Sequence, residues 1–127
     1  MNDLRRVQIP FFVPVDVGEI PAGGERSTQP AITIGPYDFI WTAVSVYIES
    51  GGSQDFSIKI RDEGTQTDFQ KDYIPVLGGL VKPNQQYNEL PVPWRFKGHT
   101  SIIVTIRNDD DTNPGRIKVV LHGYLER

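Results

Sequence analysis

The residues best suited to bind a cation form an acidic cluster in the last quarter of the chain. Three consecutive aspartates follow Asn108, and Thr112, Asn113, Pro114 and Gly115 come next. A calcium loop needs six or more converging oxygen ligands and alternates its acidic residues around a central glycine, which this segment lacks. Asp and Asn side chains also favour turns, because they hydrogen-bond to nearby backbone, and a Pro-Gly pair suits a turn. We therefore expect a hairpin turn here and no metal site.

The chain holds few other groups that could do chemistry. Its two histidines, His99 and His122, fall in different expected elements and lack the His-x-x-x-His spacing of metal ligands. Nucleophilic catalysis commonly uses a cysteine or the serine of a Gly-x-Ser-x-Gly motif, and the chain contains neither. Asp62, Glu63 and Asp68 could pair as glycosidase carboxylates do, but a small chain with 16 acidic residues produces such pairs by chance. The sequence therefore predicts no enzyme activity, no catalytic residue, no cofactor and no metal.

Composition limits the classes of partner. The net charge of the 127 residues is −3, and basic residues are scattered singly apart from Arg5-Arg6. A protein that neutralises phosphates concentrates Lys and Arg on one face, so we expect no nucleic acid partner. No long uncharged apolar run could span a bilayer, and residues 1–6 lack the apolar core of a signal peptide, so we expect neither a membrane partner nor a secretion signal.

The elements that position these residues are strands. Apolar residues recur at every second position, and no segment shows the three- and four-residue spacing of a helix. The strand-like segments are Val7–Val15, Ala31–Ile34, Phe39–Ser50, Phe56–Asp62, Phe69–Val76, Leu90–Phe96, Ser101–Asn108 and Arg116–Glu126. Short strands separated by turns are typical of an antiparallel sandwich.

We therefore predict an all-β fold of about eight strands, an antiparallel, jelly-roll-like β-sandwich with an extended N-terminal arm. An immunoglobulin-like sandwich is the alternative. The arm and the loop after it occupy residues 1–28, and residues 29–127 form a single β-sandwich domain.

Prolines predict which strands lie at sheet edges. Alternate N–H groups along a strand point to the same side, so Pro91 and Pro93 remove two donors from one side of Leu90–Phe96. Pro10 and Pro14 do the same in the N-terminal arm. We expect both segments to pair on one side only, where the prolines protect the open edges from indiscriminate pairing.

Several strands carry apolar residues on both faces. Ile102, Val104 and Ile106 share one face, as do Ile117, Val119, Leu121 and Leu125, yet Ile103, Val120, His122 and Tyr124 lie on the opposite faces. In Phe39–Ser50, we predict that the even positions from Ile40 to Ile48 face the core, so that Phe39, Trp41 and Tyr47 lie on the opposite face of the strand. A sheet with one solvated face should not carry so many large apolar groups outward.

The sequence thus indicates that this scaffold packs against a neighbour. The arm could cover one face of the sheet, and another subunit is the other cover. Trp and Arg are enriched at binding hot spots, which makes Trp94 and its neighbour contact candidates. The predicted interface residues are Val7, Ile9, Phe11, Phe12, Trp94, Arg95, Ile103 and Val120.

Three segments carry a resemblance to a known family. Gly35-Pro36-Tyr37-Asp38-Phe39-Ile40-Trp41, Asp55-Phe56-Ser57-Ile58-Lys59-Ile60-Arg61-Asp62 and Val119-Val120-Leu121-His122-Gly123-Tyr124 resemble auxiliary capsid proteins of tailed bacteriophages, also called decoration or cement proteins. The resemblance covers about residues 31–126, and the N-terminal arm is less distinctive.

This resemblance implies a non-enzymatic virion structural protein with a jelly-roll-like fold. Its place would be the outer capsid surface of a particle assembled in the host bacterial cytoplasm. Its partners would be the major capsid protein, whose subunits it bridges, and other copies of itself in a homodimer or homotrimer. The alternative is a carbohydrate-binding jelly-roll module of a phage fibre or spike, in which Trp41, Tyr47 and Trp94 would stack on sugar rings.

Overall fold

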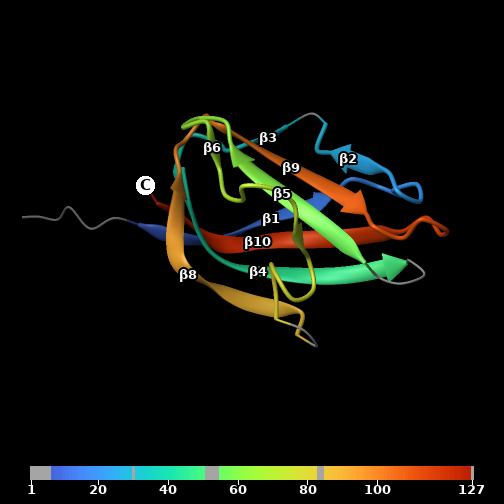
Figure 1. The fold of residues 1–127 in the computed structure, drawn as a ribbon. Helices are drawn as coiled ribbons and strands as arrows, with labels where there is room; N and C mark the ends of the chain where they lie inside the picture. Colours follow the sequence, from blue (N-terminus) through green and yellow to red (C-terminus); the bar gives the residue numbers. More distant parts are fainter. Residues whose placement is uncertain (1–6, 30, 51–54, 83–84, 127) are drawn as a thin grey trace, which may run out of the picture.

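The computed structural model of this chain describes residues 7–29, 31–50, 55–82 and 85–126. Its strands are, in chain order, β1 (Gln8–Asp16), β2 (Glu25–Ser27), β3 (Ile32–Thr33), β4 (Asp38–Ser50), β5 (Phe56–Asp62), β6 (Thr67–Asp68), β7 (Ile74–Pro75), β8 (Tyr87–Phe96), β9 (Ser101–Asn108) and β10 (Arg116–Glu126). They form two layers, with β1, β10 and β4 in the lower layer of Figure 1 and β5, β9 and β2 in the upper one. The described residues include no helix long and apolar enough to cross a membrane.

The order of the strands is that of a jelly roll. A four-stranded sheet has the order β1-β10-β4-β8, and a six-stranded sheet runs β2-β9-β5-β6, with β3 also on β9 and β7 also on β5. β2 and β3 both pair with β9, and β6 and β7 both pair with β5, so each of these two couples can be counted as one interrupted strand. Counted in this way, the ten strands become eight, with four in each sheet. A jelly roll consists of eight strands in two sheets. The predicted all-β, antiparallel, jelly-roll-like sandwich is confirmed.

Some predicted strand limits are wrong in detail. The segment Phe69–Val76 is not one strand, because only Thr67–Asp68 and Ile74–Pro75 pair with β5. β8 begins at Tyr87, three residues before the predicted start at Leu90. Gly, Asn and Gln around these positions hide the pairing from a reading of local patterns.

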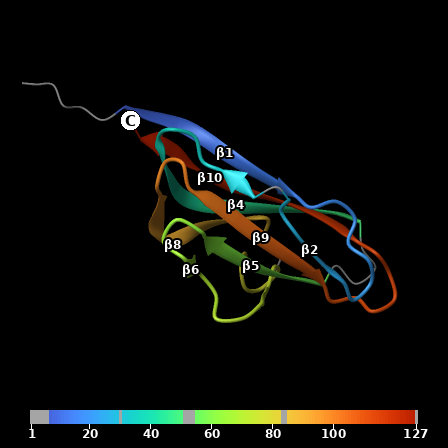
Figure 2. The ribbon, with the colours of Figure 1, turned by 90° about the horizontal axis from the view of Figure 1, so that it is seen from above.

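The N-terminal segment forms an edge of the four-stranded sheet. β1 pairs with β10 along its whole length, from Gln8 opposite Glu126 to Asp16 opposite Lys118. β8 forms the other edge, because it pairs only with β4. Figure 2 shows β1 running along the side of the sandwich next to β10. The two proline-rich segments are therefore edge strands, as predicted, and residues 1–6 of the expected arm, including Arg5-Arg6, lie outside the described residues.

The core lies between the two sheets and follows the predicted alternation. Ile102, Val104 and Ile106 of β9 are fully buried, and so are Ile117, Val119 and Leu121 of β10. The N-terminal segment also contributes, since Val13 and Val15 of β1 belong to the same core cluster. Burial of a side chain of this kind stabilises the fold by about 1.5–3 kcal/mol.

β4 changes its inward-facing positions at a β-bulge. Thr42 is an extra residue, because Trp41 pairs with Gly123 while Ala43 pairs with the preceding residue of β10. A shift of one residue turns every following side chain to the other face. Trp41 and Phe39 consequently enter the core, at 3% and 0% exposure.

The prediction that Phe39 and Trp41 face away from the core is therefore wrong. After the bulge the even positions face inward as predicted, with Val44 and Val46 buried. Tyr47 points outward and is 57% exposed. The bulge is supported by the Trp41 indole, whose Nε1 donates a hydrogen bond to the Ala43 carbonyl at 2.8 Å.

Glycine is required at the β10 side of the bulge. A Cβ atom on Gly123 would lie 1.8 Å from the carbonyl oxygen of Ile40, well inside any real contact distance. The close approach of β10 and β4 at this point depends on the absence of a side chain.

Candidate functional site

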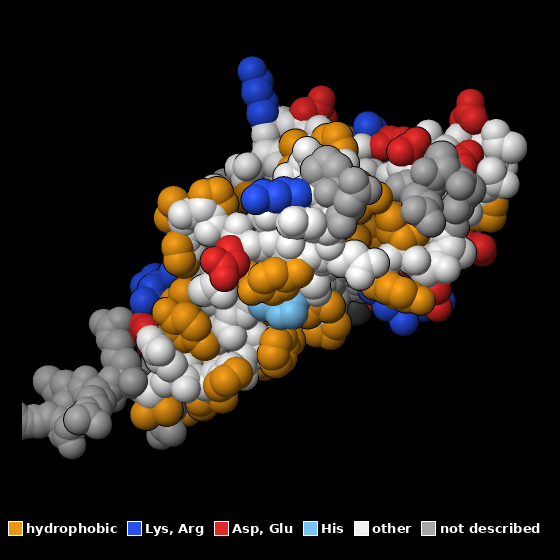
Figure 3. Space-filling model, turned by 90° about the horizontal axis from the view of Figure 1, so that it is seen from below, with side chains coloured by type: hydrophobic (Ala, Val, Ile, Leu, Met, Phe, Trp, Pro, Cys, Tyr) orange, Lys and Arg blue, Asp and Glu red, His pale blue; other side chains and the backbone are white. Residues whose placement is uncertain are grey.

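The candidate site is the solvent side of the four-stranded sheet, called the outer face below. Its side chains alternate with those that enter the core, such as Val13, Val44 and Val119. Its residues, matched across the strands by the register, are Pro10, Phe12 and Pro14 of β1; Val120, His122 and Tyr124 of β10; Ile40, Ala43, Ser45 and Tyr47 of β4; and Tyr87 of β8. Figure 3 looks at the molecule from this side and shows hydrophobic side chains gathered around a histidine.

His122 lies near the middle of the outer face. The cross-strand register places Phe12 on one side of it and Ala43 on the other. The Phe12 ring meets the imidazole edge-on with centroids 5.3 Å apart, and the Tyr87 ring does the same at 5.5 Å. The imidazole Nε2 and the Ser45 hydroxyl are 2.7 Å apart, within hydrogen-bond distance. These contacts join side chains from all four strands into one surface.

The centre of the outer face is uncharged at neutral pH. Burial lowers the pKa of His122 below its ordinary value of 6.5, because the desolvated ring disfavours the imidazolium form. The groups that contact the ring, from Phe12, Ser45 and Tyr87, carry no charge. Glu89, which pairs with Ala43 in the same row, lies at the β8 edge of the face.

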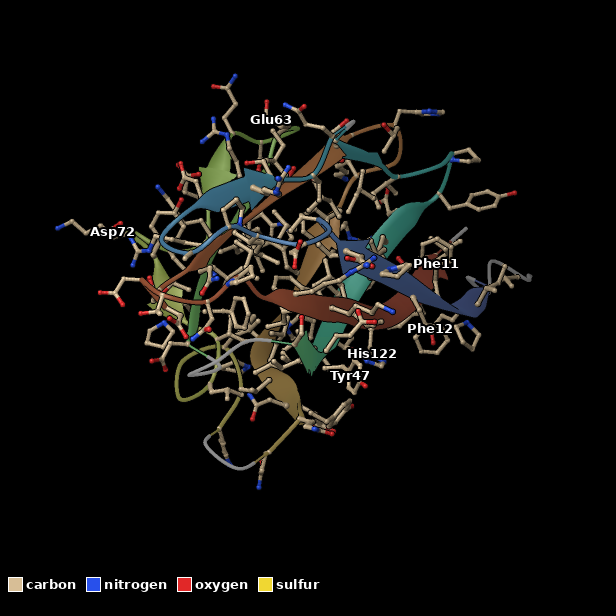
Figure 4. The ribbon with its side chains drawn as sticks, turned by 90° about the vertical axis from the view of Figure 1, so that its right-hand side faces the viewer. Phe11, Phe12, Tyr47, Glu63, Asp72 and His122 are labelled. Atoms are coloured by element: carbon tan, nitrogen blue, oxygen red, sulfur yellow. The ribbon has the colours of Figure 1, made fainter. Side chains whose placement is uncertain are left out.

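Large apolar side chains stand out from this surface. Phe12, Tyr47 and Tyr87 are 56%, 57% and 50% exposed. Figure 4 shows Phe12, His122 and Tyr47 on one side of the sheet, whereas Phe11 points from β1 in a different direction. Single exposed apolar residues are ordinary on protein surfaces, but a contiguous group of aromatic rings marks a contact surface.

Ion pairs border the outer face where β10 ends. Arg95 of β8 contacts Asp38 of β4 at 2.9 Å and Glu126 of β10 at 2.7 Å, and so joins three strands. Asp38 also accepts a hydrogen bond from the Gly98 backbone N–H at 2.8 Å. The Gly98 N–H, together with Arg95, lowers the pKa of Asp38 below its ordinary value. Lys97 approaches the same carboxylate at 4.0 Å.

A second group of ion pairs borders the opposite end of the face. Arg116 contacts Asp16 at 2.7 Å across β10 and β1, and Glu49 of β4 at 3.4 Å. Lys118 lies 3.8 Å from the same Glu49 carboxylate. The hydrogen bond from Arg116 lowers the pKa of Asp16. An apolar centre between charged borders is the usual anatomy of a protein interface.

The solvent side of the six-stranded sheet has a different character. The Tyr73 ring lies between two cations, with Lys59 Nζ at 4.7 Å and the Arg107 guanidinium at 4.3 Å from its centroid. Its hydroxyl donates to Glu25, and burial together with this carboxylate raises the pKa of Tyr73 to about 12. Arg107 also pairs with Asp109 at 2.6 Å. This side of the sandwich is mostly polar, and its Arg61 and Arg107 are paired with carboxylates.

The predicted interface residues are divided among several places. Phe12 and Val120 lie on the outer face, as the sequence indicates. Ile103 lies on the other side of the molecule, since it is opposite Arg61 of β5 in the six-stranded sheet. Val7 and Ile9, at the start of β1, are 46% and 39% exposed. One continuous surface therefore cannot include Ile103 and Val120 together.

The remaining predicted interface residues make contacts within the fold. Phe11 packs on the core and meets Phe39 edge-on at 5.7 Å between centroids. Arg95 is held in the ion pairs described above. Trp94 packs edge-on against Phe69 at 4.9 Å, and its Nε1 donates to Asp62 Oδ2 at 2.9 Å. The sequence does not predict this hydrogen bond, because the residue pattern of one strand does not show which residue of the other sheet lies opposite Trp94.

Asp62 is the acceptor in a bond that connects the two sheets. Its carboxylate is fully buried, and Oδ1 accepts a further hydrogen bond from the Gly64 N–H at 2.9 Å. A buried carboxylate is tolerated only when its oxygens are hydrogen-bonded. The indole of Trp94 meets this need from β8.

The acidic cluster forms a turn held by its own hydrogen bonds. Asp110 Oδ1 accepts from the backbone N–H groups of Thr112 and Asn113 at 2.8 and 3.0 Å. Asp109 contacts the Ser57 hydroxyl and Arg107. Within the described ranges, no group of three or more His, Cys, Asp or Glu side chains is placed to hold a metal ion.

A pocket of about 590 Å³ opens between β8 and the segment that contains β7. Its walls include Trp41, Phe69, Leu80 and Trp94, and none of the residues that line it is ionised. General acid–base chemistry requires a titratable group within reach of a bound molecule. The pocket therefore offers apolar contacts and no catalytic group.

No protein-family model and no curated protein sequence matches the chain. Among solved structures, the Drosophila NLP core, described for pentamer formation and histone binding, is 11% identical with a TM-score of 0.40 over 93% of this chain and 97% of that one. The Yersinia pseudotuberculosis-derived mitogen is 12% identical with a TM-score of 0.43, over 91% of this chain and 86% of the mitogen. SGBP-B from a xyloglucan utilization locus of Bacteroides uniformis is 12% identical with a TM-score of 0.39, over 91% of this chain and 44% of that protein.

Proposed function

We propose that this chain is a non-enzymatic structural protein whose outer face is covered by another protein subunit in an assembled particle. The observation that carries the proposal is the contrast between the two solvent sides of the sandwich. The solvent side of the six-stranded sheet carries charged side chains on β5 and β9, whereas the outer face exposes Phe12, Tyr47 and Tyr87 together. Exposure of these rings to water is unfavourable, and burial against a partner removes that cost.

The particle that fits this role best is a virion. The sequence resembles auxiliary capsid proteins of tailed bacteriophages, and the jelly roll is a fold that capsid proteins use, although a fold alone does not define a function. In this role the chain decorates and cements the outer capsid surface by bridging subunits of the major capsid protein.

The test is the presence and the contacts of the chain in purified virions. Cross-linking mass spectrometry on particles from the cells that express this chain should recover it, with cross-links from Lys118 and Lys97 to a virion protein. Phe12→Lys should lower its occupancy, because a charged side chain on the outer face resists desolvation. Ile103→Lys, on the opposite side, is the matched control and should leave occupancy unchanged. Complete absence of an expressed chain from the particles refutes the proposal.

Point substitutions suit this test better than deletion of the N-terminal segment. β1 supplies Val13 and Val15 to the core, so removal of residues 2–15 would disrupt the sandwich as well as any contact. A loss of binding after that deletion would not identify the contact surface.

Glycan binding is the second candidate, and the exposed rings of Tyr47 and Tyr87 favour it. Trp41 is 3% exposed and offers little surface for stacking on a sugar, whereas Trp94 is partly buried and lines the pocket beside β8. A glycan array probed with the intact chain and with Tyr47→Ala tests this candidate. Binding that Tyr47→Ala abolishes would establish it, and no signal on the array would eliminate it.

A further inference from the structure

We propose that the occupant of the outer face is the same face of a second copy of this chain, in a dimer with two-fold symmetry. The inference rests on the proposed function, since it names the subunit that covers the outer face. A symmetric dimer uses the same patch on both subunits, so that patch must be compatible with itself in chemistry and charge.

The chemistry at the centre of the face meets this condition. Phe12, Val120 and Tyr47 present apolar surface, and the imidazole of His122 is neutral and already paired with Ser45. An identical surface offers apolar and aromatic contacts without a buried, unpaired charge. A strongly charged partner would find no opposite charge at this centre.

Charges at the two ends of the face are balanced, and the further carboxylate, Glu89, lies at the β8 edge, where a symmetric dimer would keep it in the solvated rim. One end holds two acidic and two basic residues, Asp38, Glu126, Arg95 and Lys97, and its formal charge sums to zero. The other end holds Asp16, Glu49, Arg116 and Lys118, which also sum to zero. Either end can therefore lie over the same end or the opposite end of a second copy without a net like-charge contact.

The size of the sheet comes near what a dimer needs. β1 has nine residues, which at about 3.4 Å per residue gives a length of roughly 30 Å. Four strands about 4.8 Å apart give a width of roughly 19 Å, and thus a projected area of about 570 Å². Side-chain relief makes the accessible area larger than the projection, and a standard interface takes about 800 Å² from each partner. The face is large enough only when its charged ends take part as the rim.

The edges of the same sheet restrict the alternative of strand-to-strand association. Pro10 and Pro14 lie in β1, and Pro91 and Pro93 lie in β8, the two edge strands. Each pair removes backbone donors on alternate positions, which a continuous sheet across two chains would need. Face-to-face packing makes no demand on these donors.

Sedimentation velocity on the full chain, from sub-micromolar to about 100 µM, tests the inference, because interfaces of this size reach micromolar affinity or better. The unmodified chain should sediment as a dimer at the upper concentrations. Phe12→Lys and Tyr47→Lys should each raise the dissociation constant at least about 30-fold, as the loss of a hot spot does. Both residues are more than half exposed, so we expect these variants to fold, which circular dichroism and urea unfolding will check.

Ile103→Lys is the matched control and should leave the dimer intact. A monomer at every concentration overturns the inference, as does a dimer that both outer-face variants leave unchanged or that Ile103→Lys dissolves. A monomer in solution that is still recovered in virions would remove the dimer and leave the proposed function standing. A dimer in solution that never enters virions would refute the proposed function and leave the dimer standing.

Discussion

Two adjacent phenylalanines, Phe11 and Phe12, have opposite roles, and their replacement by alanine should separate folding from association. Phe11 packs on the core and meets Phe39 edge-on at 5.7 Å. Phe12 is 56% exposed and contacts the His122 ring on the outer face. The two substitutions remove the same atoms from neighbouring positions of one strand, so their effects on the unfolded chain and on strand propensity are nearly equal.

The expected magnitudes differ because the environments differ. Replacement of a fully buried Phe by Ala costs about 3–5 kcal/mol. Phe11 is only partly buried, so we expect Phe11→Ala to lower the free energy of unfolding by about 2–3 kcal/mol. For Phe12→Ala we expect a loss below about 1 kcal/mol, because most of its ring area is already in water in the folded monomer.

Urea unfolding followed by tryptophan fluorescence measures both effects. The protein concentration must be one at which the unmodified chain is monomeric, since association adds to apparent stability. The m-values should agree among the three proteins, which shows that the compared transitions expose the same surface. Sedimentation should give the reverse order for dimer affinity: Phe12→Ala should weaken the dimer, and Phe11→Ala should leave its affinity unchanged.

An equal loss of stability for Phe11→Ala and Phe12→Ala in the monomer would refute this reasoning. Phe12 would then belong to the internal packing of the sandwich and would no longer support a contact surface on the outer face. An unchanged dimer in Phe12→Ala would contradict the assignment of the contact surface even if the stabilities followed the prediction.

Three further substitutions test single contacts of the fold. Trp94→Phe removes the indole donor from the buried Asp62 carboxylate and should cost about 2–3 kcal/mol in urea unfolding, an effect that Asp62→Asn in the same chain should reduce. Gly123→Ala forces a Cβ atom against the Ile40 carbonyl, and we expect a loss of at least about 3 kcal/mol or no folded protein by circular dichroism. His122 has a pKa below 6.5 in the folded state, so the unfolded state binds the proton at higher pH. The free energy of unfolding should be highest above pH 6.5, fall as the pH decreases through the folded pKa and then level off. His122→Gln should flatten this part of the pH profile.

The sequence predicts the core because strand alternation is a local property. Ile102, Val104 and Ile106 follow each other at a period of two, so they share the face of β9 that packs against the other sheet. Edge strands are also predictable, since the missing N–H groups of Pro10 and Pro14 act wherever the strand lies. These inferences do not depend on which distant segment is the neighbour.

Errors of prediction arise where a distant segment decides the outcome. The extra residue Thr42 shifts the register of β4 against β10, and this shift moved Trp41 from the predicted outer side into the core. Tyr87 was missed because its role on the outer face depends on the His122 ring, 35 positions further along the chain. The choice between Ile103 and Val120 is a choice between two sheets, and strand patterns alone contain no such information.

The apolar character of the outer face is not a by-product of strand formation. The strands of the six-stranded sheet place Lys59, Arg61 and Arg107 on their solvent side and still form a complete ladder between β5 and β9. Charged side chains at the positions of Phe12 and Tyr47 would therefore be compatible with the fold, and they would lower the tendency to associate. Phe12 contacts the His122 ring within the monomer, but more than half of the surface of Phe12 and of Tyr47 is exposed to water. Coverage of the outer face by another subunit, as proposed above, would account for their presence.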